Sequence, residues 1–222
     1  MPRKNIRQLC GRPLIAWTID AARAATRLNR IVVSTDDHEI AEIATHYGAD
    51  VPFMRPSELG LDDTPDLPVF QHVLNGLRER EGYRPEVVVW LRPTAPLRTG
   101  ADIDEACGIL LSQKTDWVRS VCKAEHHPYW MFRVVEGCLT PFMEDINTAW
   151  YPRRQLLPAV YRLNGAVEVS WCRTVLAATS AYTGRIAPYV MPTERSLDID
   201  TMFELRLAEC ILARVSTDGV SM

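Results

Sequence analysis

The stretch that most constrains the fold runs VVVWLRPTAPLR, from residue 87 to residue 98. It begins with consecutive β-branched residues, which is typical of a strand buried on both faces of a parallel sheet. It ends in a loop where Pro93 and Pro96 fix φ and restrict the residues before them. Arg92 and Arg98 would project from this stiff loop at the carboxyl end of the strand, where open α/β sheets bind ligands. The alternative is a turn with two solvated arginines, and the loop alone does not separate the two interpretations.

Helical and strand patterns alternate on both sides of this stretch. Apolar residues recur with helical spacing, and short β-branched runs lie between them. The expected helices cover residues 14–22, 37–47, 67–81, 100–111 and 200–214, and the expected further strands cover 30–35, 51–54, 117–122, 161–171 and 186–191. Asp36 with Glu39, and Thr99, have the types and positions of helix caps. The alternation predicts an α/β fold with βαβ crossovers and a mostly parallel sheet, as one domain over residues 1–222.

Composition narrows the class of ligand. The net charge of −3 gives no overall basic field, so we expect no nucleic-acid partner, and an anionic ligand must meet local arginine and lysine. The six cysteines have no zinc-like spacing and are expected to be reduced, mostly buried thiols of a cytoplasmic protein. No apolar run approaches the roughly 20 residues that span a bilayer, so no membrane partner is expected either.

From about residue 125 to 158 the alternation stops and aromatic side chains crowd together. Glu136-Gly137 suggests a hairpin turn within this segment. We interpret the segment as an insertion packed on the domain. A contiguous apolar patch there would suit a subunit interface, and a private satellite core is the alternative.

The strongest candidate site is SLDID, residues 196–200. In an extended backbone alternate side chains share a face, so Asp198 and Asp200 would point one way while Leu197 and Ile199 anchor the other. Paired carboxylates are hard oxygen ligands that suit Mg²⁺ and a bound polyphosphate. The alternative is that this segment only starts the last helix, with a capping box between Thr201 and Glu204.

Basic side chains that could meet an anion are scattered along the chain. They are Arg3, Lys4, Arg55, Arg92, Arg98, Arg153, Arg154 and Arg162. Guanidinium groups match carboxylate and phosphate bidentately, although most arginines are solvated surface groups. Asn164-Gly165 reads as a turn or a close backbone approach, with the turn favoured. His126-His127 lacks further ligands at suitable spacing, so a metal site there is not expected.

The ordered motifs together resemble the acylneuraminate cytidylyltransferases, the CMP-sialic acid synthetase family. The motifs run across nearly the whole chain: PRKNI, GRPLIAWTI, VVSTDDHEIAEIA, VPFMRPSELGLDDT, RPTAPLRT, EHHPY, RRQ, YRLNGA and SLDID. The resemblance implies a three-layer nucleotidyltransferase fold with a dimerising insertion at about residues 125–158. It also implies transfer of CMP from CTP to the anomeric hydroxyl of a nonulosonic sugar acid, with Mg²⁺ as cofactor, release of pyrophosphate and a homodimer.

The resemblance also assigns roles to residues. Catalytic roles fall on Lys4, Asp198 and Asp200. The nucleotide would meet Lys4, Asn5 and Arg55. The sugar acid would lie along Arg92, Arg154, Arg162 and Asn164. The two aspartates would hold Mg²⁺.

Two departures from the family pattern qualify these roles. Family members begin with a strand and a glycine-rich loop, RxGSKGxPxKN, and MPRKN falls inside that loop, so a central strand and much of the phosphate cradle are expected upstream of it. A catalytically impaired nucleotide- or sugar-binding relative is the alternative function. In the family's QPTSPLR pattern, Arg92 and Ala95 replace Gln and Ser, and Glu168 replaces a tyrosine. Arg92 then either binds the sugar's carboxylate or pairs with Glu168 to rebuild the pocket wall.

Overall fold

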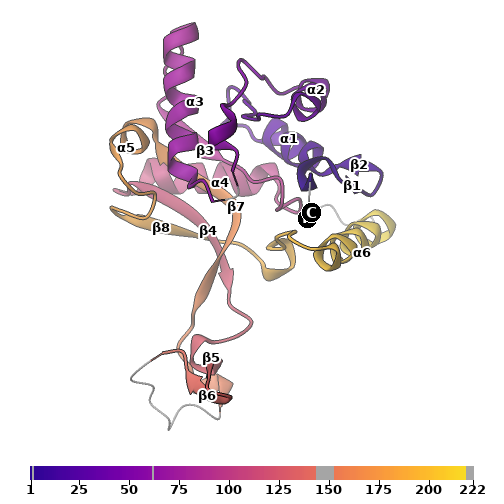
Figure 1. Ribbon diagram of the computed structural model, residues 1–222, viewed down its shortest axis with the longest axis vertical. Coiled ribbons are helices and arrows are strands. Elements are labelled where there is room, and N and C mark those ends of the chain that lie inside the picture. The colour runs from indigo at the N-terminus through magenta and orange to yellow at the C-terminus, as the bar shows by residue number, and fades with distance from the viewer. Residues whose placement is uncertain (2, 62, 144–152, 219–222) are drawn as a thin grey trace.

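A central sheet lies between helices on both faces in the computed structural model (Figure 1). The structure describes residues 1, 3–61, 63–143 and 153–218, with the backbone alone at residues 154 and 215–218. The α-helices are α1 (Leu14–Ala24), α2 (His38–His46), α3 (Asp66–Glu81), α4 (Gly100–Ser112), α5 (Cys172–Ala177) and α6 (Met202–Asp218). The strands are β1 (Gln8–Leu9), β2 (Arg12–Pro13), β3 (Val87–Trp90), β4 (Trp117–Lys123), β5 (Phe132–Val135), β6 (Cys138–Pro141), β7 (Tyr161–Trp171) and β8 (Ile186–Val190). Short 3-10 helices are η1 (Lys4–Ile6), η2 (Ser57–Leu59), η3 (Pro128–Trp130), η4 (Arg154–Leu156) and η5 (Thr193–Arg195).

The central sheet has the order β3-β7-β4-β8. Strand β7 runs antiparallel to both β3 and β4, and only β4 and β8 pair in parallel. The α/β class is therefore confirmed, but this part of the sheet is mixed where a mostly parallel one was expected. Burial patterns report which face a side chain occupies and not the direction of its strand, so the sequence could not give this orientation.

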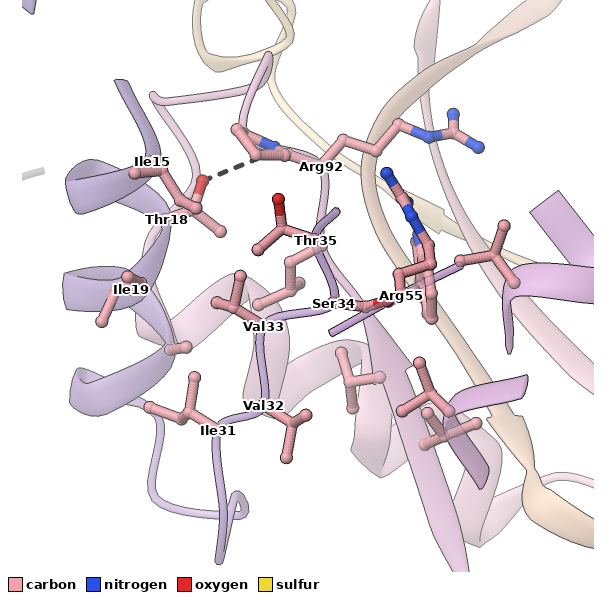
Figure 2. A pocket seen from close by; sticks show the side chains of 18 of the residues that line it. Ile15, Thr18, Ile19, Ile31, Val32, Val33, Ser34, Thr35, Arg55 and Arg92 are labelled. Atoms are coloured by element: carbon pink, nitrogen blue, oxygen red, sulfur yellow. Dashed lines mark hydrogen bonds between the residues drawn. The ribbon is translucent and has the colours of Figure 1, made fainter. Parts of the chain in front are cut away.

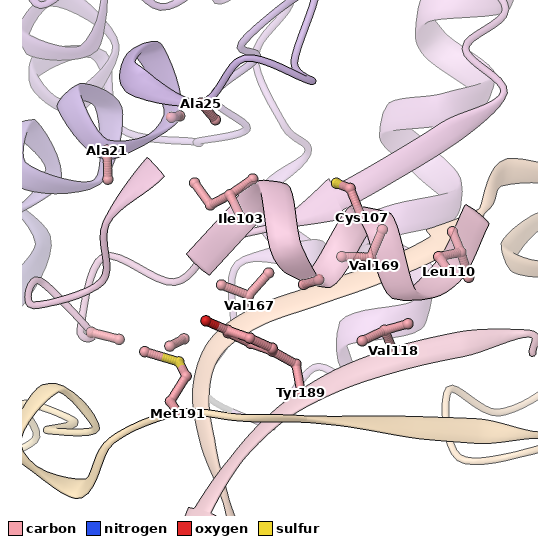
Figure 3. Close-up of a cluster of buried hydrophobic side chains, with 14 of the residues drawn as sticks. Ala21, Ala25, Ile103, Cys107, Leu110, Val118, Val167, Val169, Tyr189 and Met191 are labelled. Atoms are coloured by element: carbon pink, nitrogen blue, oxygen red, sulfur yellow. The ribbon is translucent and has the colours of Figure 1, made fainter. Parts of the chain in front are cut away.

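Strands β3 and β4 contribute alternate side chains to two cores, one on each face of the sheet. On one face Val118 and Val167 pack with Ile103 of α4 and with α1 (Figure 3). On the other face Trp117 and Val88 pack under α3 and α5. A third cluster joins β1, α1 and α6 around Leu97 and Ile199. Together the three clusters hold the strands in place, and with them the loops that follow the strands.

Residues 30–35, expected as a strand, form only a single parallel bridge, Val32 to Asp50. Val33 N and Asp50 N donate across this bridge, but in the described residues no strand pairs on the other side. The expected strand at 51–54 is also absent. A cavity of about 1150 Å³ separates residues 31–35 from β3, and Val33, Val89 and Ile19 are among its apolar lining residues.

Two helix starts follow their caps. Thr99 caps α4 in a full capping box with Asp102, so that expected cap is confirmed. Asp37, one residue after the predicted cap Asp36, accepts from Glu39 N and Ile40 N at the start of α2. Asp36 instead pairs with Arg55. The one-residue error arises because two adjacent aspartates offer the same chemistry.

Strands β5 and β6 form a hairpin that extends from the body on the ends of β4 and β7 (Figure 1). Glu136 and Gly137 have positive φ at its tip, as the sequence suggested. Every residue of the two strands is exposed. Among the described residues, no helix is both long enough and apolar enough to cross a bilayer.

Candidate active site

The loop after β3 is braced from inside by Arg98. This arginine was expected to project outward but is 3% exposed, and it donates to Ala166 O, Thr18 Oγ1 and Arg92 O. Burial lowers the pKa of the Arg98 guanidinium, while the charge of Asp102 acts in the opposite direction. Arg98 therefore fixes the loop backbone, and only Arg92 of the pair faces the cavity.

The acidic segment docks on this same loop. Ile199 N donates to Thr94 O at 2.8 Å. Ile199 is fully buried, and Leu197 packs partly against the same cluster. This is the alternation expected from an extended backbone, and it turns Asp198 and Asp200 away from that core.

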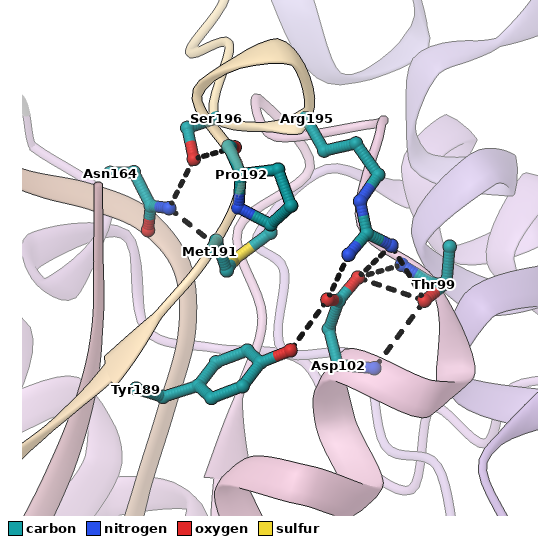
Figure 4. A network of polar contacts seen from close by, with 8 residues as sticks. All are labelled: Thr99, Asp102, Asn164, Tyr189, Met191, Pro192, Arg195 and Ser196. Carbon is teal, nitrogen blue, oxygen red and sulfur yellow. Dashed lines mark hydrogen bonds and ion pairs between the residues drawn. The ribbon is translucent and has the colours of Figure 1, made fainter. Parts of the chain in front are cut away.

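The approach to the acidic segment is held by a buried polar network (Figure 4). The Asp102 carboxylate, 1% exposed, accepts from the Tyr189 hydroxyl at 2.7 Å and from Arg195 at 2.9 and 3.0 Å. Burial, followed by the contact with Asp102, raises the pKa of Tyr189. Because Arg195 ends η5, this network sets where the segment from Ser196 begins.

Asp198 and Asp200 meet different surroundings. Asp198 Oδ1 is buried and has no hydrogen-bond partner, while Asp198 Oδ2 lies 3.7 Å from where a Cβ on Gly165 would be. Asp200 is exposed, and its Oδ1 accepts from Lys4 Nζ at 2.8 Å. Thr201 Oγ1 accepts from Phe203 N and the Glu204 carboxylate accepts from Thr201 N, so these two residues cap the helix and its start does not use Asp200. The helix-cap alternative therefore holds for Thr201 and Glu204, while the Mg²⁺ role of Asp198 and Asp200 stays a prediction.

Arg55 and Arg92 lie at the same end of the cavity (Figure 2). Arg55 Nη2 bonds Asp36 Oδ1 at 2.7 Å, and Arg55 Nε is buried without a partner. Arg92 Nη2 donates to Asp66 and lies 3.3 Å from Glu168 Oε1. The pairing of Arg92 with Glu168 was one of the two alternatives from the sequence, and it is confirmed. Lys4 and Asn5 line the same cavity.

The other predicted sugar-side residues with described side chains, Arg162 and Asn164, do not line this cavity. Arg162 contacts Glu125 and donates to Ser196 O at 3.1 Å. Asn164 is 1% exposed and is saturated by Ser120 Oγ, Ser196 Oγ and Ala166 N. We correct the expectation that Asn164 contacts the sugar, because its amide faces the interior between β4 and the acidic segment. The side chain of Arg154 lies outside the described residues.

Gly165 sits within β7 and does not form a hairpin turn. Its φ is +64°, at a shift in the register of β7 with β4. A Cβ there would lie 3.5 Å from Arg92 Nη1 and 3.7 Å from Asp198 Oδ2. The favoured interpretation of Asn164-Gly165 as a turn is therefore wrong, and these ordinary contact distances do not by themselves show the close backbone approach; the glycine is needed for its positive φ.

Sequence reasoning missed two charged residues near the site. Arg119 lies in β4 among apolar residues and contacts Glu168 at 3.2 Å. Asp66 begins α3 and was not singled out from the sequence, yet it accepts a hydrogen bond from Arg92. The signal for Arg119 was available, since a charge inside an otherwise apolar strand needs a partner.

The described side chains hold no group of three or more His, Cys, Asp or Glu placed to bind a metal by themselves. His127 accepts from Tyr129 N and packs on the Tyr129 ring. Any divalent cation at Asp198 and Asp200 would need ligands from substrate or water, which is how Mg²⁺ is usually held at polyphosphates.

Comparison with solved structures identifies the fold. The fold matches CMP:2-keto-3-deoxy-manno-octonic acid synthetase complexed with CTP, with a TM-score of 0.67 and 14% identity over 96% of this chain and 93% of that one. It also matches 4-diphosphocytidyl-2C-methyl-D-erythritol synthase from Anaerococcus prevotii, with a TM-score of 0.66 and 14% identity over 94% and 91%. The fold is that of an α/β nucleotidyltransferase.

Comparison of amino-acid sequences shows the family to which the chain belongs. A family model described as cytidylyltransferase matches residues 1–199, so the chain belongs to the cytidylyltransferase family. It is 30% identical to the CMP-N,N'-diacetyllegionaminic acid synthase of Legionella pneumophila, over 96% of this chain and 90% of the relative. It is 30% identical to the N-acylneuraminate cytidylyltransferase of Escherichia coli O18:K1:H7, over 99% of this chain but only 50% of the relative. The resemblance found in the motifs is confirmed, and the chain is a nucleotidyltransferase of the CMP-sialic acid synthetase type.

Proposed function

We propose that the protein transfers CMP from CTP to the anomeric hydroxyl of a nonulosonic sugar acid, in a Mg²⁺-dependent reaction that releases pyrophosphate. The sugar's anomeric oxygen forms a bond to the α-phosphorus, the bond from that phosphorus to the bridging oxygen breaks, and the hydroxyl proton passes to solvent. The observation that carries the proposal is the bond from Ile199 N to Thr94 O, which joins the acidic segment to the arginine-bearing loop. Cations and carboxylates from distant segments thereby come close enough to position a triphosphate and neutralise its charge, as nucleotidyl transfer requires.

Lys4 and Asn5 are proposed for the nucleotide phosphates at the cavity entrance, and Arg55 for the nucleotide pocket. Lys4 already bonds Asp200, so its ammonium lies where a phosphate next to that carboxylate would be neutralised. Arg55 has a buried Nε without a partner, which an incoming acceptor would satisfy.

Asp198 and Asp200 are proposed to hold Mg²⁺. The fit rests on Asp198 Oδ1, a buried oxygen with no hydrogen bond, since such an oxygen is costly to leave unpaired. When bound, the ion would supply charge neutralisation on the triphosphate. The chain's own contribution is to hold both carboxylates on one face of an anchored segment.

The sugar acid is proposed to lie beside Arg92, with Arg162 and Arg154 farther along the same side. Asn164 would act by holding Ser196 in place. Relatives of similar identity are named for acylneuraminate, legionaminic and pseudaminic acids, so the choice among these acids is left to assay. A catalytically impaired relative is not favoured by the comparisons.

The test is pyrophosphate release from CTP, GTP and UTP with a panel of nonulosonic acids, with and without Mg²⁺. We expect release with CTP, with at least one acid, and only when Mg²⁺ is present. CTP binding without release for any acid would contradict transfer. Faster release with GTP or UTP would contradict the choice of base.

We further propose that the β5–β6 hairpin makes a homodimer contact and that the enzyme works in the cytoplasm. The support is apolar exposure, with Val134 75% and Leu139 69% exposed, on a two-stranded hairpin that would be marginal alone. Sedimentation should give a dimer for the natural protein and a monomer for Val134→Lys/Leu139→Lys. If the natural protein sediments as a monomer, the proposed dimer contact is wrong.

A further inference from the structure

Four alternating charges run from the sheet interior to the cavity: Arg119, Glu168, Arg92 and Asp66. Glu168 Oε2 lies 3.2 Å from Arg119 Nη2, and Glu168 Oε1 lies 3.3 Å from Arg92 Nη2. The same Arg92 nitrogen donates to the Asp66 carboxylate. Glu168 thus lies between two guanidinium groups, and Arg92 lies between two carboxylates.

The two ends of this line differ in burial. The side chains of Arg119 and Glu168 are 4% and 9% exposed, whereas those of Arg92 and Asp66 are 33% and 46% exposed. Arg119 lies directly opposite Glu168 in the β4–β7 register, donates to Ala181 O at 2.7 Å and lies over the Tyr182 ring. Breaking a buried pair leaves an unpaired charge, while breaking a half-exposed pair returns a carboxylate to water. The contact that can be exchanged is therefore the one between Arg92 and Asp66.

Arg92 also lies beside the acidic segment. Its Nη1 and Asp198 Oδ2 both lie within 3.7 Å of the point where a Cβ on Gly165 would stand. Gly165 has no such atom, so the space beside both groups is open from that side. A ligand held by Arg92 would lie next to the carboxylate proposed for the metal.

We propose that Asp66 occupies the place of the substrate's carboxylate on Arg92, and that Glu168, braced by Arg119, is the positioning residue that holds Arg92 there. This inference rests on the proposed function and assigns Arg92 to the acid group of the sugar. Its guanidinium presents a planar fork that suits a carboxylate. On binding, the substrate's carboxylate replaces that of Asp66.

The charges support this exchange. With Asp66 in place the four groups sum to zero. When Asp66 leaves, the remaining Arg119, Glu168 and Arg92 carry one positive charge, located at the cavity. One carboxylate restores neutrality, and an uncharged sugar does not. These charged residues therefore favour binding of the sugar acid over binding of its uncharged ester.

The experiment compares N-acetylneuraminate with its methyl ester by calorimetry, on the natural protein and on Asp66→Asn. We expect Asp66→Asn to bind the acid roughly two- to fivefold tighter, as removal of a competing exposed ion pair allows. We expect the ester to bind neither protein better than the acid. Asp63→Asn, a nearby exposed carboxylate, is the matched control and should leave both affinities unchanged. Unchanged or weaker acid binding by Asp66→Asn, or no acid binding by either protein, overturns the inference.

A second pair of variants tests Glu168. Glu168→Gln leaves Arg119 unpaired and can fail to fold, so Arg119→Met/Glu168→Gln, which removes both charges, accompanies it. In whichever variant folds, KM for the sugar acid should rise about tenfold or more while KM for CTP changes less than about twofold. Equal rises in KM for the sugar acid and KM for CTP would mean that Glu168 only stabilises the sheet and does not position Arg92. Absence of pyrophosphate release in the natural protein rejects the proposed transfer, whereas the calorimetry still decides the exchange at Arg92.

Discussion

Ile199 N donates to Thr94 O at 2.8 Å, and this one bond ties the C-terminal acidic segment to the proline-braced loop. Ile199 is fully buried, so its neighbours in the extended backbone, Asp198 and Asp200, must point away from the core. The bond therefore fixes both the position and the direction of the carboxylates. Substitutions at these aspartates should act on chemistry more than on folding.

We expect Asp198→Asn and Asp200→Asn each to reduce kcat by roughly 100-fold or more, because an amide retains the shape but removes the charge that would hold a cation. Asp200 is exposed, so Asp200→Asn should change the protein's free energy of unfolding by no more than about 0.5 kcal/mol. Pyrophosphate release and thermal melting measure the two effects. Glu204→Gln is the control, since Glu204 caps α6 through Thr201 and should lower Tm while sparing kcat. Parallel loss of kcat and stability in Asp200→Asn would return Asp200 to a role in the helix start.

Asn164→Ala should destabilise the protein by about 1–3 kcal/mol, because it leaves Ser120 and Ser196 without their amide partner in a buried site. Denaturant unfolding measures this change. Since Ser196 precedes the acidic segment, kcat should fall as well, with KM for the sugar acid little changed. A rise in KM alone, at unchanged stability, would instead place Asn164 on the sugar.

Asp104 should make stability depend on pH on the acid side. Burial by itself would raise the pKa of Asp104, but hydrogen bonds from Thr26 and Arg27 lower it below the ordinary 3.8. A carboxyl whose pKa is lower in the folded state stabilises that state above its unfolded pKa, and this contribution is lost as pH falls through the folded value. Tm should therefore drop below about pH 4, and Asp104→Asn should flatten that drop. Glu42→Gln, an exposed carboxylate of α2, serves as the control. An unchanged acid limb in Asp104→Asn would refute the linkage.

The cysteines should fall into two groups of reactivity. The sequence suggested mostly buried thiols, but Cys10, Cys138 and Cys210 are exposed and Cys107, Cys122 and Cys172 are buried. Burial raises the pKa of both Cys107 and Cys172 to about 11, so little thiolate forms at neutral pH. We expect an aromatic disulfide reagent to titrate three thiols rapidly in Val134→Lys/Leu139→Lys, where the proposed dimer contact cannot cover Cys138, and all six after denaturation. Rapid reaction of all six without denaturant would contradict this arrangement.

Local signals in the sequence located most elements, because they depend on neighbouring residues. Strand β7 and the Thr99 cap followed directly from alternation and from capping chemistry. The direction of β7 did not follow, since alternation is the same in either direction. Residues 30–35 have the composition of a strand but lack a second pairing partner among the described residues. Composition alone does not tell how many neighbouring strands will pair with a segment.

The site could be predicted to the level of residue type but not of orientation. Arg92 and Arg98 share one loop and one chemistry, yet Arg98 turns inward to donate to Ala166 O. Which arginine is buried depends on where β7 passes, and β7 lies far away in the sequence. Asn164 was placed on the sugar for the same reason, since the register shift that turns its amide inward arises from pairing with β4.

The cavity between residues 31–35 and β3 leads to the last prediction. Its walls include Val33, Val89 and Ile19, and residues 31–35 and β3 both border it. An extended apolar segment placed there would bury these side chains and gain backbone hydrogen bonds on two sides.

We therefore expect a run of five valines, fused ahead of Met1 through a glycine-serine linker, to raise Tm by at least about 5 °C, or roughly 2 kcal/mol for a chain of this size. The same fusion with threonine in place of valine keeps the β-branched shape but adds hydroxyls, and it should give little increase, because those hydroxyls would be buried against apolar walls without partners. Equal Tm values for the two fusions would mean that the segment does not enter the cavity.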